Sequence, residues 1–165
     1  TINLLYSQAK VNLLAMLFRI IYNGCILSKM SIEYLSKSIE DTKDIGKQLS
    51  KSGHRVFVFE GELGSGKTTL IQGFAEGLGV KNITSPTFIL MNKYPIKNKK
   101  NFCHFDFYRI KNKEEAMFAK EVIFDETNVA CIEWPVKETL PKNVVKIKME
   151  VINECKRKII IDYGK

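Results

Sequence analysis

A hydrophobic run that ends in a glycine-rich loop constrains this chain more than any other feature. Run and loop together are Phe57-Val58-Phe59-Glu60-Gly61-Glu62-Leu63-Gly64-Ser65-Gly66-Lys67-Thr68-Thr69-Leu70. Gly61, Gly66, Lys67 and Thr68 fit the pattern G-x-x-x-x-G-K-[ST], with β-branched and aromatic residues before it and an amphipathic helical pattern after it. The stretch therefore predicts a strand, a phosphate-binding loop and a helix, in this order.

The residue types in this loop have a physical explanation. Backbone N–H groups converge on an anion only in left-handed or tightly turned conformations, which Gly61, Gly64 and Gly66 permit at little steric cost. Because the loop opens a helix, unpaired N–H groups and the positive end of the helix dipole face the same anion. In such a loop Lys67 bridges the β- and γ-phosphates and the Thr68 hydroxyl ligates Mg²⁺. A glycine-rich turn with a surface lysine is the alternative, and a chance match to the pattern is on the order of one percent.

The composition predicts one globular domain, but it does not indicate which ligand the domain binds. The chain has 165 residues, 45% hydrophobic and 27% charged, which is enough for a single core. Its net charge of +8 indicates either a nucleic-acid partner or lysines spread over a solvated surface. The lysines are scattered rather than gathered on one helix, which favours the second interpretation. The four cysteines form no C-x-x-C pair and no metal-site spacing, so we expect reduced thiols in a cytoplasmic protein.

Residues 1–29 differ from the rest of the chain. Val11 to Leu27 is largely apolar, and Met30 begins a sequence that resembles a natural start. Three interpretations compete: a signal or membrane anchor, a genuine amphipathic extension, or an upstream stretch joined by a misassigned start codon. Arg19 interrupts the apolar stretch and no small-residue cleavage site follows it, so no membrane association is expected. We expect a dispensable or misassigned extension, with the domain over residues 30–165.

The remaining patterns predict alternating strands and helices. Ser38 is a candidate N-cap for a helix that ends near Gly53. The helix after the loop spans Lys67 to Leu78, and its apolar face comprises Leu70, Ile71, Phe74 and Leu78. The expected strands are residues 32–35, 54–59, a strand after Pro86, 102–108, 128–132, 144–152 and 156–162, with helical tendency over 113–118. The third and fourth of these strands form a hairpin with a basic tip at residues 97–100, and the last two form a C-terminal hairpin about Asn153-Glu154.

Two carboxylates suit the chemistry of a phosphate loop. Asp106 follows an apolar strand, and Glu133 ends the strand Val129-Ala130-Cys131-Ile132. A carboxylate at such a position is costly unless it is paired or binds a cation, so both are candidates for holding Mg²⁺ and orienting the attacking water. Trp134 either packs on the nucleotide or a partner, or fills the core. His104 is expected to be buried for packing alone, and Arg109 to meet phosphate or Asp106.

Four motifs in order resemble the TsaE (YjeE) family of bacterial ATPases. They are Gly61 to Thr69, Ser85-Pro86-Thr87, His104-Phe105-Asp106-Phe107-Tyr108-Arg109 and Glu133-Trp134-Pro135. The resemblance covers residues 31–165. It implies a single three-layer α/β domain of the P-loop NTPase type, with a mixed, partly parallel central sheet and the C-terminal β-hairpin. It also implies a role in making the threonylcarbamoyl adenosine found beside the anticodon of many tRNAs.

The resemblance further implies roles for particular residues. Gly61, Glu62, Leu63, Gly64, Ser65, Gly66, Lys67, Thr68 and Thr69 would bind the phosphates of ATP. Glu133 and Asp106 would join Thr68 at Mg²⁺ and act with Lys67 in hydrolysis. Thr87 would contact the γ-phosphate from a switch-like loop, and Thr42 would lie near the base. Glu62 and Phe107 replace an Asp and a Leu that are usual in the family.

The resemblance implies partners as well. TsaD- and TsaB-type proteins would work with this chain, and tRNA would be contacted indirectly or weakly. Slow ATP hydrolysis by the chain alone is expected, with partner-dependent turnover. Two alternatives are a P-loop kinase that transfers phosphate to a small molecule, and a nucleotide-gated binding module without turnover. The stretch after Thr87 lacks an Arg-rich lid, which argues against the kinase.

Overall fold

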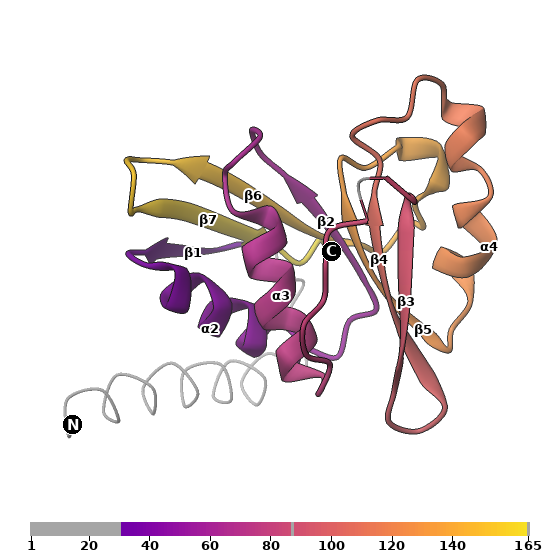
Figure 1. Cartoon of the computed structure of the whole chain (residues 1–165), viewed down its shortest axis with the longest axis horizontal. Helices are drawn as coiled ribbons and strands as arrows, with labels where there is room; N and C mark the ends of the chain where they lie inside the picture. The colour runs from indigo at the N-terminus through magenta and orange to yellow at the C-terminus, as the bar shows by residue number, and fades with distance from the viewer. Residues whose placement is uncertain (1–30, 87, 165) are drawn as a thin grey trace, which may run out of the picture. The chain divides into compact units, whose positions relative to one another are not determined.

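A seven-stranded mixed β-sheet runs through the part of the chain that the structure describes (Figure 1). The computed structural model describes residues 31–86 and 88–164. The strands stand in the order β1-β7-β6-β2-β5-β4-β3. Their bounds are β1 Ser31–Ser36, β2 Val56–Glu60, β3 Met91–Ile96, β4 Lys100–Asp106, β5 Asn128–Glu133, β6 Val145–Val151 and β7 Arg157–Asp162.

The centre of the sheet is parallel and its two sides are antiparallel. Strands β6, β2, β5 and β4 run parallel to one another. Strands β1 and β7 on one side, and β3 on the other, pair antiparallel with their neighbours. Because the carboxyl ends of parallel strands meet at one edge of a sheet, the loop after β2 and the last residues of β4 and β5 lie together.

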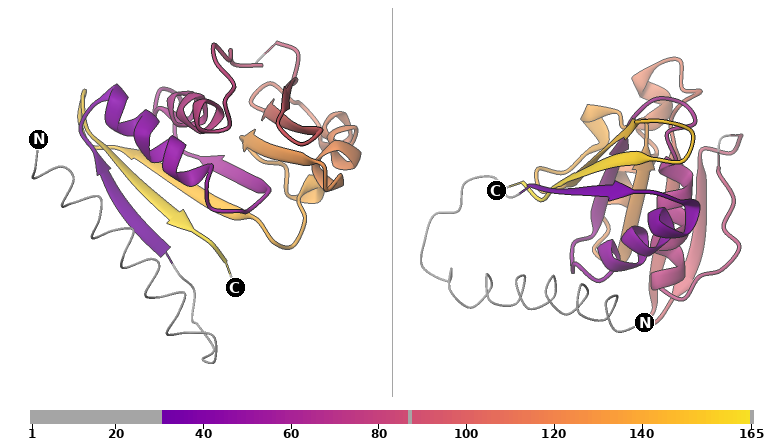
Figure 2. Two further views of the ribbon diagram at one scale, coloured as in Figure 1. Left: turned by 90° about the horizontal axis from the view of Figure 1, so that it is seen from below. Right: turned by 90° about the vertical axis from the view of Figure 1, so that its left-hand side faces the viewer.

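Helices cover both faces of the sheet. The α-helices α2 (Ile39–Leu49) and α3 (Lys67–Gly77) lie side by side on one face (Figure 2). On the other face lie α4 (Ala119–Phe124) and the 3₁₀ turns η1 (Lys113–Ala116) and η2 (Lys137–Thr139). This arrangement gives three layers, so the predicted α/β fold with its mixed sheet is confirmed.

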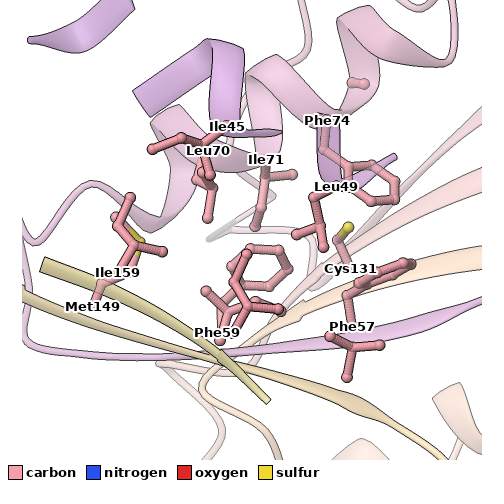
Figure 3. Close-up of a cluster of buried hydrophobic side chains, with 14 of the residues drawn as sticks. Ile45, Leu49, Phe57, Phe59, Leu70, Ile71, Phe74, Cys131, Met149 and Ile159 are labelled. Carbon is pink, nitrogen blue, oxygen red and sulfur yellow. The ribbon is translucent and has the colours of Figure 1, made fainter. Parts of the chain in front are cut away.

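Strand β2 lies between two apolar clusters because its side chains alternate between the faces. Phe57 and Phe59 pack under α2 and α3, whereas Val56 and Val58 pack with the α4 side. Figure 3 shows the first cluster, in which side chains from α2 and α3 face Phe57, Phe59 and the strands beside them. The rings of Phe57 and Phe74 meet edge to face, with 4.7 Å between centroids. Buried on both faces, β2 fixes the position at which the glycine-rich loop begins.

The helices α2 and α3 approach each other closely. A Cβ atom on Gly73 would overlap the backbone carbonyl of Lys43, and one on Gly46 would lie 2.7 Å from the amide nitrogen of Phe74. Hence both positions need glycine for a steric reason, whatever its cost in helix propensity.

Most of the elements expected from the sequence are present. Ser38 caps α2, because its hydroxyl accepts a hydrogen bond of 3.0 Å from the Asp41 amide, and the contact is worth about 0.5–2 kcal/mol. The helix after the loop begins at Lys67, and Leu78 is its C-cap residue. Both expected hairpins form, as β3 with β4 and as β6 with β7.

The boundaries of several elements differ from the prediction. Helix α2 ends at Leu49 rather than near Gly53, because residues 50–52 form a turn. Strand β4 begins at Lys100, so the basic tip is shorter than expected, and it turns at Asn98 and Lys99, which have φ values of 63° and 56°. Residues 113–118 hold a single 3₁₀ turn, Lys113–Ala116, which the Asn112 side chain caps by accepting a hydrogen bond from the Glu115 amide.

The predictions for residues 1–29 and for Thr87 lie outside the described residues. Residues 31–164 form one compact unit. Within the described ranges, every helix is too short or too polar to cross a membrane.

Candidate functional site

The loop between β2 and α3 has the backbone conformation that its glycines permit. Gly61, Gly64 and Gly66 have φ values of 152°, 77° and 99°, all in the left-handed region. A Cβ atom at Gly61 would lie 2.5 Å from the carbonyl oxygen of Met149, so a larger residue would clash there. The first residue of α3 follows the loop directly, which places the amino-terminal end of α3 at its mouth.

The Lys67 side chain is held inside the loop. Its Nζ atom donates hydrogen bonds of 2.9 Å to the carbonyl oxygens of both Gly61 and Glu62. The same atom lies 4.3 Å from the centroid of the Trp134 ring. Burial lowers the pKa of the Lys67 ammonium, and the carboxylates of Glu133 and Asp106 offset part of that lowering. The loop therefore contains a poorly hydrated cation, which can attract an anion.

Glu133 connects the loop to the end of β5. Its Oε1 atom accepts a hydrogen bond of 2.9 Å from the Thr68 hydroxyl, and it lies 3.0 Å from Nε2 of His104. The Glu133 side chain is almost fully buried, and the register pairs Glu133 with Asp106 of β4. The structure thus brings the two predicted carboxylates together beside the predicted hydroxyl.

Asp106 contacts the segment that follows α3. Its Oδ2 atom lies 3.3 Å from the Ser85 hydroxyl, and its Oδ1 atom accepts a hydrogen bond of 3.0 Å from the Tyr108 amide. Ser85 belongs to the expected switch-like loop, so that loop does reach the strand end. The next residue but one, Thr87, lies outside the described residues.

Trp134 lies partly against the core and partly along the cleft, and its predicted packing on the nucleotide or a partner stays a prediction. Its backbone has a φ of 56°, which directs the chain away from the end of β5. The ring packs partly against the apolar cluster on the α4 side, and it also faces Lys67 and lies 5.0 Å from the Tyr108 ring. Trp134 therefore forms a wall of the site while also contributing to the core.

Arg109 has a partner that sequence reasoning missed. The guanidinium carbon lies 4.3 Å from the centroid of the Phe88 ring, a cation–π contact. Phosphate and Asp106 were the expected partners. The sequence did not indicate this contact between Phe88 and Arg109, because the two residues are 21 positions apart and meet only when the intervening chain folds back.

These residues line a cleft of about 430 Å³. Its walls come from the loop, from the ends of β4 and β5 and from the segment at Ser85. The lining residues are Leu63, Gly64, Gly66, Lys67, Thr68, Thr69, Ser85, Asp106, Tyr108, Arg109, Glu133 and Trp134.

A second cleft of about 320 Å³ adjoins the first, since Gly66 and Thr69 line both. The amino-terminal end of α2 and the turn between β6 and β7 form its other walls, which include Thr42, Cys155 and Arg157. The Thr42 hydroxyl is used within the fold, because it donates to the carbonyl of Ser38 at 3.0 Å and lies 2.6 Å from the Ser36 hydroxyl. Cys155 and Arg157 were not predicted, since they reach this position only through the strand order.

The donor set fits a magnesium–phosphate group. Within the described ranges no cluster of three or more His, Cys, Asp or Glu side chains could hold a metal alone. In proteins Mg²⁺ usually binds through one or two carboxylates together with substrate phosphates, and Glu133 and Asp106 would supply the carboxylates, with the Thr68 hydroxyl beside them. The buried Ser65 hydroxyl has no hydrogen-bond partner among the described residues, so it is available to donate a hydrogen bond to an anion in the loop.

The sheet order and the loop between β2 and α3 define an α/β domain of the P-loop fold. A profile of the family described as "Threonylcarbamoyl adenosine biosynthesis protein TsaE" matches residues 36–159. This chain therefore belongs to the TsaE family, as its motifs indicated.

Individual relatives agree with the family assignment. The tRNA threonylcarbamoyladenosine biosynthesis protein TsaE of Aquifex aeolicus is 31% identical over 134 residues, which are 78% of this chain and 94% of that protein. The protein of the same name from Bacillus subtilis is 36% identical over 126 residues, 73% of this chain and 78% of its own. The one from Borreliella burgdorferi is 40% identical over 83 residues, 49% of this chain and 60% of its own.

A solved structure supports the fold independently. The crystal structure of Bacillus subtilis YdiB superposes with a TM-score of 0.67 at 27% identity, and the match covers 84% of this chain and 90% of that one. The roles of individual site residues remain predictions, which the geometry above makes specific.

Proposed function

We propose that this chain binds Mg²⁺-ATP in the 430 Å³ cleft and hydrolyses it slowly, as an accessory subunit in the formation of threonylcarbamoyl adenosine in tRNA. The observation that carries the proposal is the hydrogen bond of 2.9 Å between the Thr68 hydroxyl and Glu133. It joins the phosphate loop to a strand-end carboxylate, which is the arrangement that phosphoryl transfer requires. Relatives from three organisms carry names that refer to this tRNA modification.

The loop residues would bind the phosphates. Their backbone N–H groups and the amino-terminal end of α3 provide donors without a charged side chain. Lys67 would exchange its bonds to the carbonyls of Gly61 and Glu62 for the β- and γ-phosphates. Since burial already disfavours the hydration of this ammonium, the exchange costs little additional desolvation.

Thr68, Glu133 and Asp106 would hold Mg²⁺ beside the γ-phosphate. The ion, when bound, neutralises charge on the phosphate oxygens. Glu133 accepts a hydrogen bond from the Thr68 hydroxyl, which would leave the oxygen lone pairs of Thr68 for the ion. Asp106 lies beside Glu133 in the register and would orient the attacking water.

The second cleft would receive the base and ribose. It joins the phosphate cleft at Gly66 and Thr69, so a nucleotide can lie across both. Thr42 contributes by shaping the amino-terminal end of α2, because its hydroxyl is bonded to Ser38. Arg157 and Cys155 form the opposite wall.

A cytoplasmic location and partners of the TsaD and TsaB type complete the proposal. Exposed apolar side chains near the phosphate cleft support protein partners, since Leu63 of the loop is 72% exposed and Phe88 is 81% exposed. Arg109, which lines the cleft, lies on Phe88. A partner that covers Phe88 would therefore change the surroundings of a cation beside the phosphates, which explains why turnover would depend on partners.

ATP turnover by the purified chain, alone and with TsaD- and TsaB-type proteins, tests this function. We expect slow Mg²⁺-dependent turnover alone, a clear rise with the partners, and ATP-dependent capture of the partners in a pull-down. Thr68→Val should lose these activities, whereas Lys97→Ala at the β3–β4 tip, outside both clefts, should retain them. Turnover that partners leave unchanged would contradict the proposal, and transfer of the γ-phosphate to a small acceptor would favour a kinase.

A further inference from the structure

A histidine lies beneath the carboxylate that contacts Thr68. His104 is on β4, two residues before Asp106, and its side chain is fully buried. Its Nε2 atom lies 3.0 Å from Oε1 of Glu133. Its Nδ1 atom is buried and has no hydrogen-bond partner among the described residues. One ring nitrogen of His104 is thus used and the other is not.

The difference between the two ring nitrogens of His104 indicates which of them carries the proton. A proton on Nδ1 would bury an unpaired N–H group, whereas a proton on Nε2 is donated to a carboxylate. His104 therefore donates from Nε2. Oε1 of Glu133 then accepts two hydrogen bonds, one from His104 and one from Thr68.

We propose that His104 is a positioning residue, which sets the orientation of the Glu133 carboxylate and thereby that of the Thr68 hydroxyl at the Mg²⁺ site. A carboxylate with one donor can rotate about its terminal bond, whereas two donors on one oxygen fix that oxygen. His104 is not among the residues that line the cleft, so it acts without touching the nucleotide. Buried packing alone, which the sequence suggested, leaves the Nε2 contact without an explanation.

The measurement that tests this is the effect of Mg²⁺ on nucleotide affinity, with Trp134 fluorescence as the readout. Trp134 is the only tryptophan and lines the cleft. We compare the Kd for ADP in Mg²⁺ with that in EDTA for the full chain and for His104→Leu. Because the loss of a group that orients a metal ligand costs about 10–100-fold in metal affinity, the Mg²⁺ effect should shrink at least about tenfold. Affinity in EDTA should change less than about twofold, since His104 is not among the residues that line either cleft.

Matched variants separate positioning from folding. In His104→Gln the amide nitrogen can occupy the place of Nε2, so most of the Mg²⁺ effect should return. His104→Asn is equally polar but too short, and should behave like His104→Leu. Cys103→Ala alters the neighbouring buried residue of β4, which belongs to the cluster on the opposite face, and should keep the wild-type effect.

The outcomes distinguish this inference from the proposed function on which it rests. A wild-type chain with no Mg²⁺ effect would overturn both. A wild-type Mg²⁺ effect that persists in folded His104→Leu and His104→Asn would overturn the positioning role alone. If His104→Leu does not fold, the two amide variants are compared instead. A larger Mg²⁺ effect in His104→Gln than in His104→Asn would support the positioning role. Equal Mg²⁺ effects in the two folded variants would overturn it, because a purely structural role predicts no difference between them.

Discussion

Replacement of Gly73 by Ala should destabilise the protein, although alanine is the better helix former. Gly73 lies in α3 and faces the backbone of α2. An added Cβ atom would overlap the carbonyl oxygen of Lys43 and lie 2.5 Å from its Cα atom, closer than real Cβ contacts. These are backbone atoms, which cannot rotate aside as a side chain would. The two helices must therefore move apart.

The two opposing effects differ in size. Overpacking of a close contact costs about 1–3 kcal/mol, and because the three nearest atoms all belong to the Lys43 backbone, we place this site in the upper part of that range. Exchange of Gly for Ala inside a helix gains about 0.8–1 kcal/mol. The net loss should be about 1–2 kcal/mol. For a domain of this size, such a loss corresponds to a fall in Tm of about 2–8 °C.

Urea unfolding followed by far-UV circular dichroism measures this loss. Gln72→Ala, at the neighbouring position of α3, is the control and should remain within about 0.5 kcal/mol of the wild type. Gly46→Ala should also destabilise, and the double variant should lose less than the sum, because separation of the helices relieves both contacts. A Gly73→Ala protein as stable as the wild type would show that helix propensity outweighs the contact, and would refute the reasoning.

Two further predictions concern the clefts. Cys155 is exposed whereas Cys103 and Cys131 are buried, so a thiol reagent should label Cys155 faster than those two. Because Cys155 lines the second cleft, bound ADP should slow its labelling, which peptide mass mapping measures. A labelling rate that ADP leaves unchanged would mean that the base binds elsewhere. Lys67→Met should lose at least about tenfold in ADP affinity, since it removes the phosphate cation. Its unfolding midpoint in urea should equal or exceed that of the wild type, because burial disfavours the ammonium and lowers its pKa; a clear decrease would contradict this interpretation.

The sequence predicted the parts of the site that depend on local pattern. The loop at residues 61–69 has a required order of residue types, so its position between a strand and a helix followed from the pattern alone. Asp106 and Glu133 followed from one rule about strand ends, and the register confirms that they are neighbours. Their roles in binding and hydrolysis remain predictions.

The contacts that the sequence could not predict depend on which strands and helices are neighbours. His104 was expected to serve packing only, because its contact with Glu133 exists only when β4 and β5 pair in parallel with this register. Arg157 and Cys155 reach the second cleft because β6 pairs with β2, which brings the β6–β7 turn to the loop. The need for glycine at Gly46 and Gly73 likewise arises from the packing of two helices, and a single sequence cannot show it.

The balance of charge in the phosphate cleft connects the proposed function with the role of His104. Among the described residues, four charged side chains line this cleft: Lys67 and Arg109 are cationic, and Asp106 and Glu133 are anionic. Their charges cancel, so the negative charge of a triphosphate would remain uncompensated in a partly buried site. A divalent cation restores the balance, and the nucleotide should therefore bind much more tightly with Mg²⁺ than without it. Glu133 can couple the binding of Mg²⁺ to that of the nucleotide only while its carboxylate keeps one orientation. The proposed role of the hydrogen bond from His104 is to hold the carboxylate in that orientation.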